Sequence, residues 1–323
     1  METTNNIQTP VLFLIYNRPK HTQKVFETIR KAKPAKLFIA ADGANPNKPD
    51  DELKCLQARE IIKSIDWECE LYLRFLNENR GCKVAVSSAI DWFFGNVEQG
   101  IILEDDCIPH ESFFTYCDVL LDKYKDDEEV GCINSVNFMS TANDTASTYY
   151  FTKFPQVWGW ATWRRAWKRY DVNMKNFPDF LKKNLISKYA RTKNEQIHWL
   201  EKFERVSQGK IDTWDYQWLF AHWYYDMKAI APSHNITSNI GFDLDATHTK
   251  KPSTKFSYRP VSAVVNITHP AQHSRDDKAD QLLYDSIYRR HTLYYMYARL
   301  KIIKSRWAQT PEPKVSQTAL YAQ

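Results

Sequence analysis

Glycine is scarce in this chain, and glycine-rich phosphate loops are missing. Only 8 of the 323 residues are glycine. The first apolar segment is followed by Asn17-Arg18-Pro19, and neither G-x-G-x-x-G nor G-x-x-x-x-G-K-S/T occurs anywhere in the sequence. These absences exclude the two common motifs in which a glycine-rich turn holds a nucleotide phosphate. If the protein binds a nucleotide, other groups must neutralise the phosphate charge.

Cysteine pairs and long apolar runs are missing as well. The 6 cysteines form no C-x-x-C pair and show no zinc spacing, which is typical of free thiols in a reducing compartment. No segment approaches the ~20 apolar residues of a transmembrane helix, and residues 1–10 lack the layout of a signal peptide. We therefore expect a cytoplasmic protein. The net charge of +5 is modest and no recognition module is visible, so we expect no nucleic-acid partner.

The first hundred residues alternate strand and helix patterns. Strand-like runs cover residues 11–16, 36–41 and 70–75 and continue from Gly100, whereas helical patterns cover residues 21–31, 51–65 and 81–94. This order predicts an α/β fold with a mostly parallel central sheet and helices on both of its faces. In such folds, ligands bind at the carboxyl ends of the strands.

The strand that begins at Gly100 ends in three acids, Glu104, Asp105 and Asp106. A carboxylate near an apolar interior costs free energy unless another group compensates it. Mn²⁺ and Mg²⁺ prefer hard oxygen ligands of this kind. An acidic loop after a strand is the simpler interpretation of the triplet alone. However, Asn17-Arg18 and Asp42-Gly43 end neighbouring strands at the same predicted edge, and this convergence favours a metal site that holds a diphosphate.

These motifs together resemble a known family of enzymes. Residues 11–19, 41–43, 79–81 and 102–109 are similar to the nucleotide half of the GT-A fold, the fold of nucleotide-diphospho-sugar transferases. The resemblance is to family-two-like glycosyltransferases of the bacterial HlpA-like branch. A weaker likeness is to the Golgi β-1,2-N-acetylglucosaminyltransferase that initiates complex N-glycans. The similarity continues through residues 158–163, 214–215 and 238–241, and it covers residues 8–250.

The resemblance implies roles for individual residues. The nucleotide-binding residues would be Asn17, Arg18, Asp42, Arg80 and Asp105. In this assignment Asp42 contacts the uracil or ribose, Asp105 faces the ribose and Asp106 binds the metal, with His248 as a second metal ligand on a late loop. The sugar or acceptor would contact Trp158, Gly159, Trp160 and Trp214. Each assignment competes with a simpler one, since Arg18 can be a surface arginine and Asp42-Gly43 an ordinary turn.

Asp215 is the predicted catalytic base. An inverting transferase needs a carboxylate that accepts the proton of the acceptor hydroxyl, and the resemblance places Asp215 at that position, ahead of Asp212, Asp226 and Asp243. With Thr213 as N-cap, Asp215 falls in the first turn of a helix, where the helix dipole also favours a carboxylate for purely structural reasons. The Golgi enzyme has two adjacent acids after its tryptophan, whereas Tyr216 follows Asp215 here.

The aromatic segment 156–165 is expected to contribute both to ligand binding and to the core. Indole rings stack on sugars or fill a core with similar ease. We expect Trp158 and Trp160 near the donor sugar or the acceptor, and Trp163 and Trp167 in packing. Gly159 is expected to let a ligand approach the backbone closely.

The rest of the chain differs in character. We expect a catalytic domain at residues 8–250, with a nucleotide-binding half (8–109) and an acceptor half (110–250). A lid and a basic aromatic helix follow at 251–310, and a disordered tail at 311–323. Residues 287–307 combine cations with aromatics and contain no acid. They predict either a helix on the inner membrane face or one packed on the domain.

The sequence therefore predicts an inverting, metal-dependent glycosyltransferase that uses a nucleotide sugar, with UDP favoured, and Mn²⁺ or Mg²⁺. A glycan, lipid-linked glycan or glycoprotein would be the acceptor, as in polysaccharide biosynthesis. Two alternatives stay open. One is a catalytically silent GT-A-like carbohydrate-binding protein. The other is a metal-dependent nucleotidyltransferase or phosphohydrolase, which would require a second acid pair that the sequence does not reveal.

Overall fold

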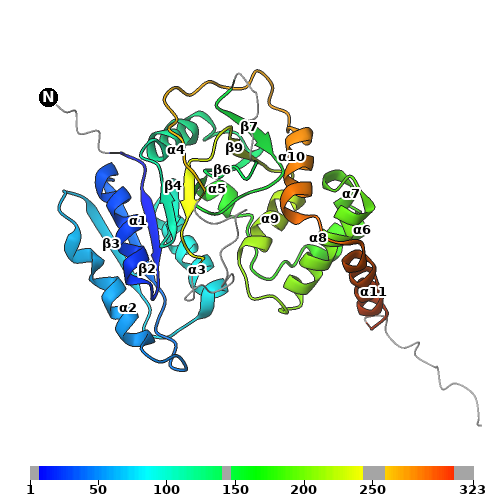
Figure 1. Cartoon of the computed structure of the whole chain (residues 1–323), viewed down its shortest axis with the longest axis horizontal. Coiled ribbons are helices and arrows are strands. Elements are labelled where there is room, and N and C mark those ends of the chain that lie inside the picture. The colour runs from blue at the N-terminus through cyan, green and yellow to red at the C-terminus, as the bar shows by residue number, and fades with distance from the viewer. Residues whose placement is uncertain (1–6, 140–146, 243–258, 309–323) are drawn as a thin grey trace, which may run out of the picture.

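A computed structural model describes residues 7–139, 147–242 and 259–308, and side chains as far as residue 302. Within these residues the main sheet has eight strands in the order β3-β2-β1-β4-β8-β6-β9-β7 (Figure 1). The strands are β1 (Val11–Ile15), β2 (Lys36–Ala41), β3 (Glu70–Phe75), β4 (Gln99–Glu104), β6 (Val130–Asn134), β7 (Tyr149–Thr152), β8 (Trp160–Trp163) and β9 (Lys228–Pro232). β8 runs antiparallel to β4 and β6, and β7 antiparallel to β9, while the other neighbours are parallel.

Helices cover both faces of this sheet because successive strand residues point to opposite sides. Phe13 of β1 lies in the core formed with α1 and α4, whereas its neighbour Leu12 lies in the core formed with α3 and α9. The helices of these two layers are α1 (Pro19–Ala32), α2 (Asp51–Arg59), α3 (Gly81–Asn96), α4 (Ser112–Lys123), α5 (Arg164–Trp167) and α9 (Asp215–Tyr224). A strand buried on both sides explains why the β1 sequence is apolar throughout.

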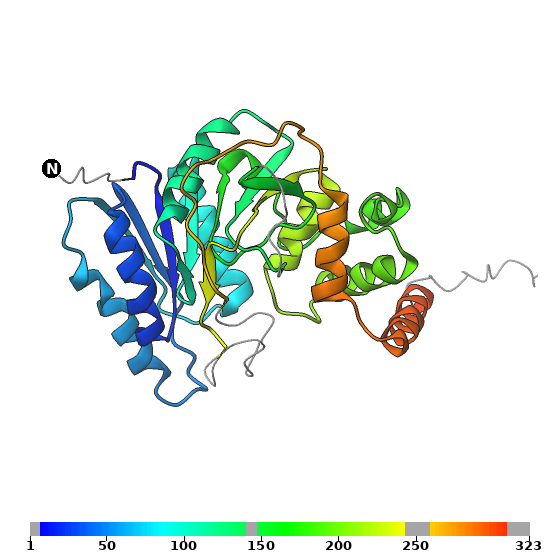
Figure 2. The ribbon, with the colours of Figure 1, turned by 45° about the horizontal axis from the view of Figure 1, so that its top comes forward.

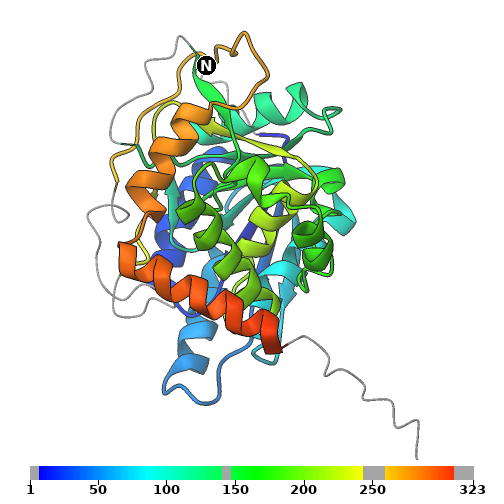
Figure 3. The same ribbon diagram turned by 90° about the vertical axis from the view of Figure 1, so that its right-hand side faces the viewer.

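A helical region adjoins the sheet on the side of α9 (Figure 2). It contains α6 (Phe177–Lys182), α7 (Ile186–Tyr189), α8 (Lys193–Ser207), α10 (Asp277–Leu283), a π-helical turn (Tyr284–Tyr288) and α11 (Thr292–Ala308). An aromatic core that includes Trp199, Phe203 and Trp223 joins α8 to α9. α11 lies against α8 (Figure 3). None of the helices described is long and apolar enough to cross a membrane.

A second, two-stranded sheet pairs β5 (Cys107–Pro109) with β10 (Thr237–Asn239) in antiparallel orientation. β5 follows the acid triplet directly, so this pairing brings residues 237–241 beside the carboxyl end of β4. Two segments more than 120 residues apart in the sequence therefore meet at the predicted site.

The structure confirms the predicted α/β class, with a mostly parallel sheet, helices on both faces and a helical C-terminal extension. The predicted strand at 70–75 agrees with β3. The first helix begins at Pro19 rather than at residue 21, because proline is well accommodated at a helix N-terminus. The predicted helix at 51–65 ends at Arg59 and tightens into a 3₁₀ turn, Glu60–Ser64. The predicted domain boundaries stay predictions.

Candidate active site

The acid triplet lies at the carboxyl edge of the sheet and is neutralised in part by Arg18. Arg18 follows β1, the parallel neighbour of β4, so its side chain reaches the same edge. Its guanidinium donates to the carboxylates of Asp105 and Asp106, the latter at a distance of 2.9 Å between Nη1 and Oδ2. Burial and the neighbouring carboxylates, of which Asp106 is first, raise the pKa of Glu104 to about 8. One arginine thus offsets only part of the charge of three neighbouring acids.

The segment after β10 covers Asp106. The Asn239 amide donates to Asp106 Oδ1 at 3.2 Å, and the Ile240 amide N–H donates to the Asp106 carbonyl at 2.9 Å. A Cβ atom at Gly241 would lie 2.2 Å from Asp106 Oδ2 and 2.9 Å from Arg18 Nη1, so only glycine fits this position. Sequence reasoning did not identify Asn239 as a contact of the acids, because the β5–β10 pairing that brings it there is not visible in the sequence.

A cavity of about 390 Å³ lies between this edge and the N-terminus of α9. Its acidic groups are Glu104, Asp106 and Asp215, and its cation is Arg18. The remaining lining residues are Cys82, Val157, Trp158, Ile211, Thr213, Trp214, Tyr216, Asn239, Gly241 and Phe242. We refer to it as the central cavity. It is lined by several of the predicted site residues, namely Arg18, Asp106, Trp158, Trp214 and Asp215.

Asp215 has one carboxylate oxygen anchored and one without a partner among the residues described. Oδ1 accepts hydrogen bonds from the Thr213 hydroxyl and, at 2.9 Å, from the amide N–H of Tyr216. The prediction that Thr213 caps the helix is wrong, because its hydroxyl donates to the Asp215 carboxylate and α9 has no side-chain cap. The arrangement orients the carboxylate and leaves its second oxygen available for a proton.

The alternative bases are less suitably placed. Asp212 is exposed and does not line the central cavity. Asp226 lies after the far end of α9, where it accepts hydrogen bonds from Lys188 and Tyr189. Asp243 and the predicted metal ligand His248 lie outside the residues that the structure describes. Among the described candidates, only Asp215 faces the central cavity.

One prediction for the aromatic segment needs correction. Trp160 does not face a ligand, because it is fully buried in β8 and packs against Trp167, Trp214 and Trp218. Trp158 precedes the strand and does line the cavity. At Gly159, a φ of +73° and the approach of Ser135 Oγ to 3.1 Å from an added Cβ already explain the glycine, and the close approach of a ligand to its backbone stays a prediction.

Asp42 and Arg80 take structural positions rather than lining the central cavity. The Asp42 carboxylate accepts hydrogen bonds from the amide N–H groups of Gly43, Arg80 and Gly81, at 2.9, 2.9 and 3.0 Å. It therefore ties the end of β2 to the start of α3. The Arg80 side chain is exposed and pairs with Glu78 at 3.0 Å. Asp105 is 2% exposed and does not line the central cavity either, whereas the neighbouring Glu104 does.

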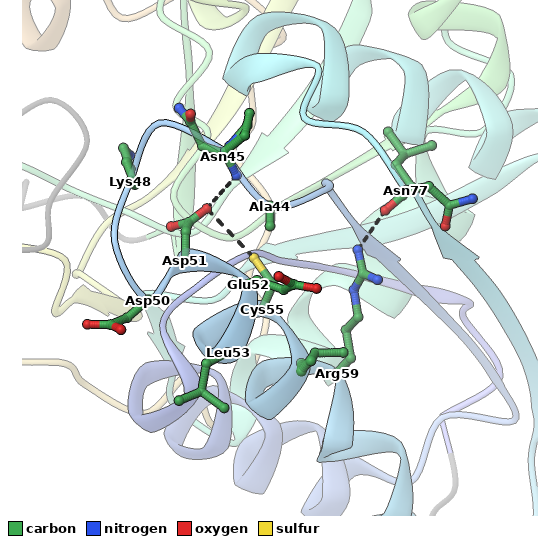
Figure 4. Close-up of a pocket in the computed structure, with 13 residues that line it drawn as sticks. Ala44, Asn45, Lys48, Asp50, Asp51, Glu52, Leu53, Cys55, Arg59 and Asn77 are labelled. Atoms are coloured by element: carbon green, nitrogen blue, oxygen red, sulfur yellow. Dashed lines mark hydrogen bonds between the residues drawn. The ribbon is translucent and has the colours of Figure 1, made fainter.

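Asn17 contacts a different part of the edge. Its amide donates to the buried Asp51 carboxylate, which also accepts from the Tyr16 hydroxyl at 2.6 Å and from the Asn45 amide N–H at 2.7 Å. Burial alone would raise the pKa of Asp51, but these hydrogen bonds lower it. A cavity of about 630 Å³ lies beside this group, between the β2–α2 loop and Arg59 (Figure 4). It is larger than the central cavity, but the carboxylate at its base is already hydrogen-bonded.

The donor set of the central cavity fits a hard divalent cation. In the parts of the chain that the structure describes, no three His, Cys, Asp or Glu side chains are close enough to hold a metal ion. Mg²⁺ and Mn²⁺ do not require such a group, since one or two carboxylates, water and substrate phosphates suffice. Asp106 and Glu104 both line the cavity, and a buried oxygen of Asp105, Oδ2, has no partner. The edge thus has more acid than Arg18 alone can compensate.

Comparisons with known proteins show only distant similarity. No family model matches the sequence, and no curated protein matches it. Among solved structures, a mannosyltransferase from Pyrobaculum calidifontis in complex with GDP-Man and Mn²⁺ is 14% identical, with a TM-score of 0.37, covering 69% of this chain and 71% of that one. GalNAc-T7 with UDP, GalNAc and Mn²⁺ is 9% identical, with a TM-score of 0.45, covering 78% of this chain and 46% of that one.

UDP-glucose pyrophosphorylase in its apo form is 12% identical to this chain. Its TM-score is 0.37, and the match covers 70% of this chain and 90% of that one. This chain spans less than half the length of GalNAc-T7. The similar structures include both glycosyltransferases and a nucleotidyltransferase.

Proposed function

We propose that the protein is an inverting, metal-dependent glycosyltransferase of the GT-A fold that uses a nucleotide sugar, with UDP favoured. One observation carries the proposal. Asp106 of the acid edge and Asp215, whose hydrogen bonds from the described residues all go to Oδ1, line the same cavity. A transferase of this class needs these two functions on opposite sides of the anomeric carbon. The sequence resemblance to the HlpA-like branch supports the same assignment.

Asp215 is the proposed base. The oxygen of an acceptor hydroxyl forms a bond to the anomeric carbon, the bond between that carbon and the diphosphate oxygen breaks, and Asp215 takes the hydroxyl proton. Attack from the side opposite the leaving group inverts the anomeric configuration. The hydrogen bonds of Thr213 and Tyr216 to Oδ1 hold the carboxylate so that Oδ2 can receive the proton.

The donor diphosphate is assigned to the acid edge. Arg18 lines the cavity and is the cation that the chain itself supplies there. A divalent cation held by Asp106, with Glu104 beside it, would neutralise the charge of the departing nucleoside diphosphate. Residues 8–250 would form the catalytic unit, and the acceptor would be a glycan, a lipid-linked glycan or a glycoprotein.

Calorimetric titration with UDP, GDP and CDP, each with and without Mn²⁺, tests the donor site. We expect one nucleotide to bind in a metal-dependent way, and D106A to lose this binding. No binding of any nucleotide would overturn the proposal and favour the silent carbohydrate-binding alternative. Formation of a nucleotide sugar from a nucleoside triphosphate and a sugar phosphate would instead identify a nucleotidyltransferase.

Asp215→Asn tests the base, with Asp212→Asn as the matched control two residues before the helix. We expect the first variant to bind donor normally and to lose transfer, and the control to retain both. Continued turnover by D215N would place the base elsewhere.

We also propose that α11 contacts an anionic membrane. Tyr295, Ala298 and Ile302 of α11 are buried, on the face that meets α8. The opposite stripe, which we call the outer face of α11, consists of Leu293, Met296, Tyr297 and Leu300, each between 59% and 76% exposed. The cations Arg299 and Lys301 are exposed on either side of this stripe. An apolar stripe between cations suits the headgroup region of an anionic bilayer.

Vesicle flotation tests this contact. We expect the protein to float with phosphatidylcholine vesicles that contain phosphatidylglycerol and not with phosphatidylcholine alone. L293Q/L300Q should lose flotation, whereas L53Q/L56Q, which changes two exposed leucines of α2, should retain it. Equal behaviour of the two double variants would refute the assignment to α11.

A further inference from the structure

A second cavity adjoins the central cavity at Asp215. It has a volume of about 210 Å³ and shares Val157, Trp158, Asp215 and Tyr216 with the central cavity. We call it the aromatic cavity, because its other walls include Phe138, Trp199 and Tyr288. The chain segments that form it are the 155–158 segment, α8, the start of α9 and the π-helical turn before α11. A molecule in this cavity would lie on the far side of Asp215 from much of the acid edge.

Two buried polar groups of this cavity lack partners. His198 is 1% exposed and Trp199 is fully buried, and both line the cavity. Neither His198 Nδ1 nor the Trp199 indole Nε1 has a hydrogen-bond partner within the described chain. A buried N–H without an acceptor is costly. Burial, together with the nearby charges of Lys202 and Arg290, also lowers the pKa of His198 to about 3, so its imidazole is neutral. Both nitrogens are themselves buried, so the wall behind the cavity is neutral and its charged side chains are Asp215 and Arg290.

One cationic side chain that lines the cavity forms no ion pair with the described residues. Arg290 lines it and is exposed, and its guanidinium forms no ion pair with any described residue. The adjacent Arg289, by contrast, pairs with Asp285 at 3.6 Å. Among the lining residues that the structure describes, Asp215 is the only acid. A ligand with a negative group would therefore place that group near Arg290 and away from Asp215.

We propose that the aromatic cavity is the acceptor subsite and that it binds a sugar residue carrying an anionic group, a carboxylate or a phosphate. The inference rests on the proposed function of Asp215. The apolar faces of a sugar ring pack on the aromatic side chains of the cavity, and its anionic group pairs with the exposed Arg290. A hydroxyl of a sugar held there has Asp215 beside it as the proton acceptor.

Three probes test the ligand class: methyl glucuronide, glucose 6-phosphate and methyl glucoside. Their affinities are measured by ligand-observed NMR on the full chain in the presence of UDP and Mn²⁺. We expect one or both anionic sugars to bind about tenfold more tightly than methyl glucoside, the size of a hydrogen bond to a charged group at a partly solvated site. Preference for the glucuronide identifies a carboxylate, and preference for the phosphate identifies a phosphorylated or lipid-diphosphate-linked acceptor.

Arg290→Gln is the decisive variant, and Arg289→Gln is its matched control. R290Q should lose the preference for anionic sugars and bind methyl glucoside as the unmodified protein does, whereas R289Q should retain the preference. An equal loss in both variants, or none in either, overturns the proposal. Tyr288→Leu removes an aromatic ring that lines the cavity and is only partly buried, and it should weaken all three sugars several-fold. Unchanged affinities in this variant would exclude the cavity.

The outcomes also separate this inference from the function on which it rests. If UDP binds with Mn²⁺ but no sugar probe binds, the acceptor assignment fails while the donor site stands. If UDP does not bind either, the proposed function fails first. Far-ultraviolet circular dichroism and the free energy of unfolding of each variant establish that a lost preference is not a loss of folding.

Discussion

Arg18 should be essential for the stability of the metal-free protein, and Arg18→Met is the direct test. The guanidinium lies between Asp105 and Asp106, and the side chains of Arg18 and Asp105 are 14% and 3% exposed. Asp105 already has one buried oxygen without a partner. Methionine keeps much of the side-chain volume but removes the charge and both ion pairs, so the carboxylate of Asp105 would be left buried and uncompensated.

Removing one partner of a buried ion pair typically costs about 3–5 kcal/mol. Because Arg18 serves two acids, one of them almost fully buried, we expect R18M to lose an amount within this range. The measurement is urea denaturation followed by tryptophan fluorescence, with chelator present to remove metal. The control is Arg30→Met, which breaks the exposed ion pair with Asp66 and should change the free energy of unfolding little.

Added Mn²⁺ extends the test. If Asp106 binds the ion, ligand binding to the folded state raises stability by roughly 2.7 kcal/mol at a concentration of one hundred times the Kd, and this recovery should be greater in R18M than in the unmodified protein. A loss below about 1 kcal/mol in R18M, comparable to a surface pair, would refute the reasoning. It would mean that groups other than Arg18 compensate the acid edge.

Three further predictions concern the core and its charges. Trp160→Ala should lower the free energy of unfolding by about 3–5 kcal/mol, and Trp158→Ala by clearly less; equal losses would contradict the core position of Trp160. Glu195→Gln leaves Lys153, whose Nζ lies 2.8 Å from Glu195 Oε1 in a buried ion pair, without its counter-charge. We expect a loss of about 3–5 kcal/mol in urea denaturation, and an unchanged midpoint would show that the pair is not needed. Burial raises the pKa of Asp280 to about 6, above its unfolded value of about 3.9, so its contribution to stability falls as the pH rises from about 4 to about 6. Asp280→Asn should flatten that part of the stability–pH curve, and an unaltered slope would exclude Asp280 as its source.

The sheet and its acidic edge were predictable because local patterns determine them. β1 is apolar throughout, and β2 and β4 contain the apolar runs 37–41 and 101–103, which indicate strands buried on both faces. Polar residues at their ends must then share one edge, because parallel strands end on the same side. This rule predicts that Arg18 and Asp106 lie at the same edge, and the structure places their side chains in contact.

Other site residues could not be placed because distant packing decides their roles. The Asp42 carboxylate accepts hydrogen bonds from the amide N–H groups of Arg80 and Gly81, which lie about 40 positions later, at the start of α3. Trp158 and Trp160 are both tryptophans in the same segment, so residue type does not distinguish them. Trp160 enters the core because β8 begins there. His198 and Arg290 are more than 90 residues apart and share a cavity because α8 and the C-terminal helices pack together.

The two cavities beside Asp215 differ in the physical basis of binding. The central cavity presents Glu104, Asp106 and Arg18, so a ligand there is held mainly by charge. The aromatic cavity presents rings, with Arg290 at an exposed position. Salt screens charge interactions and hardly affects the packing of apolar surfaces. Asp215 lines both cavities, so the residue that we propose as the base is also one that molecules in either cavity can reach.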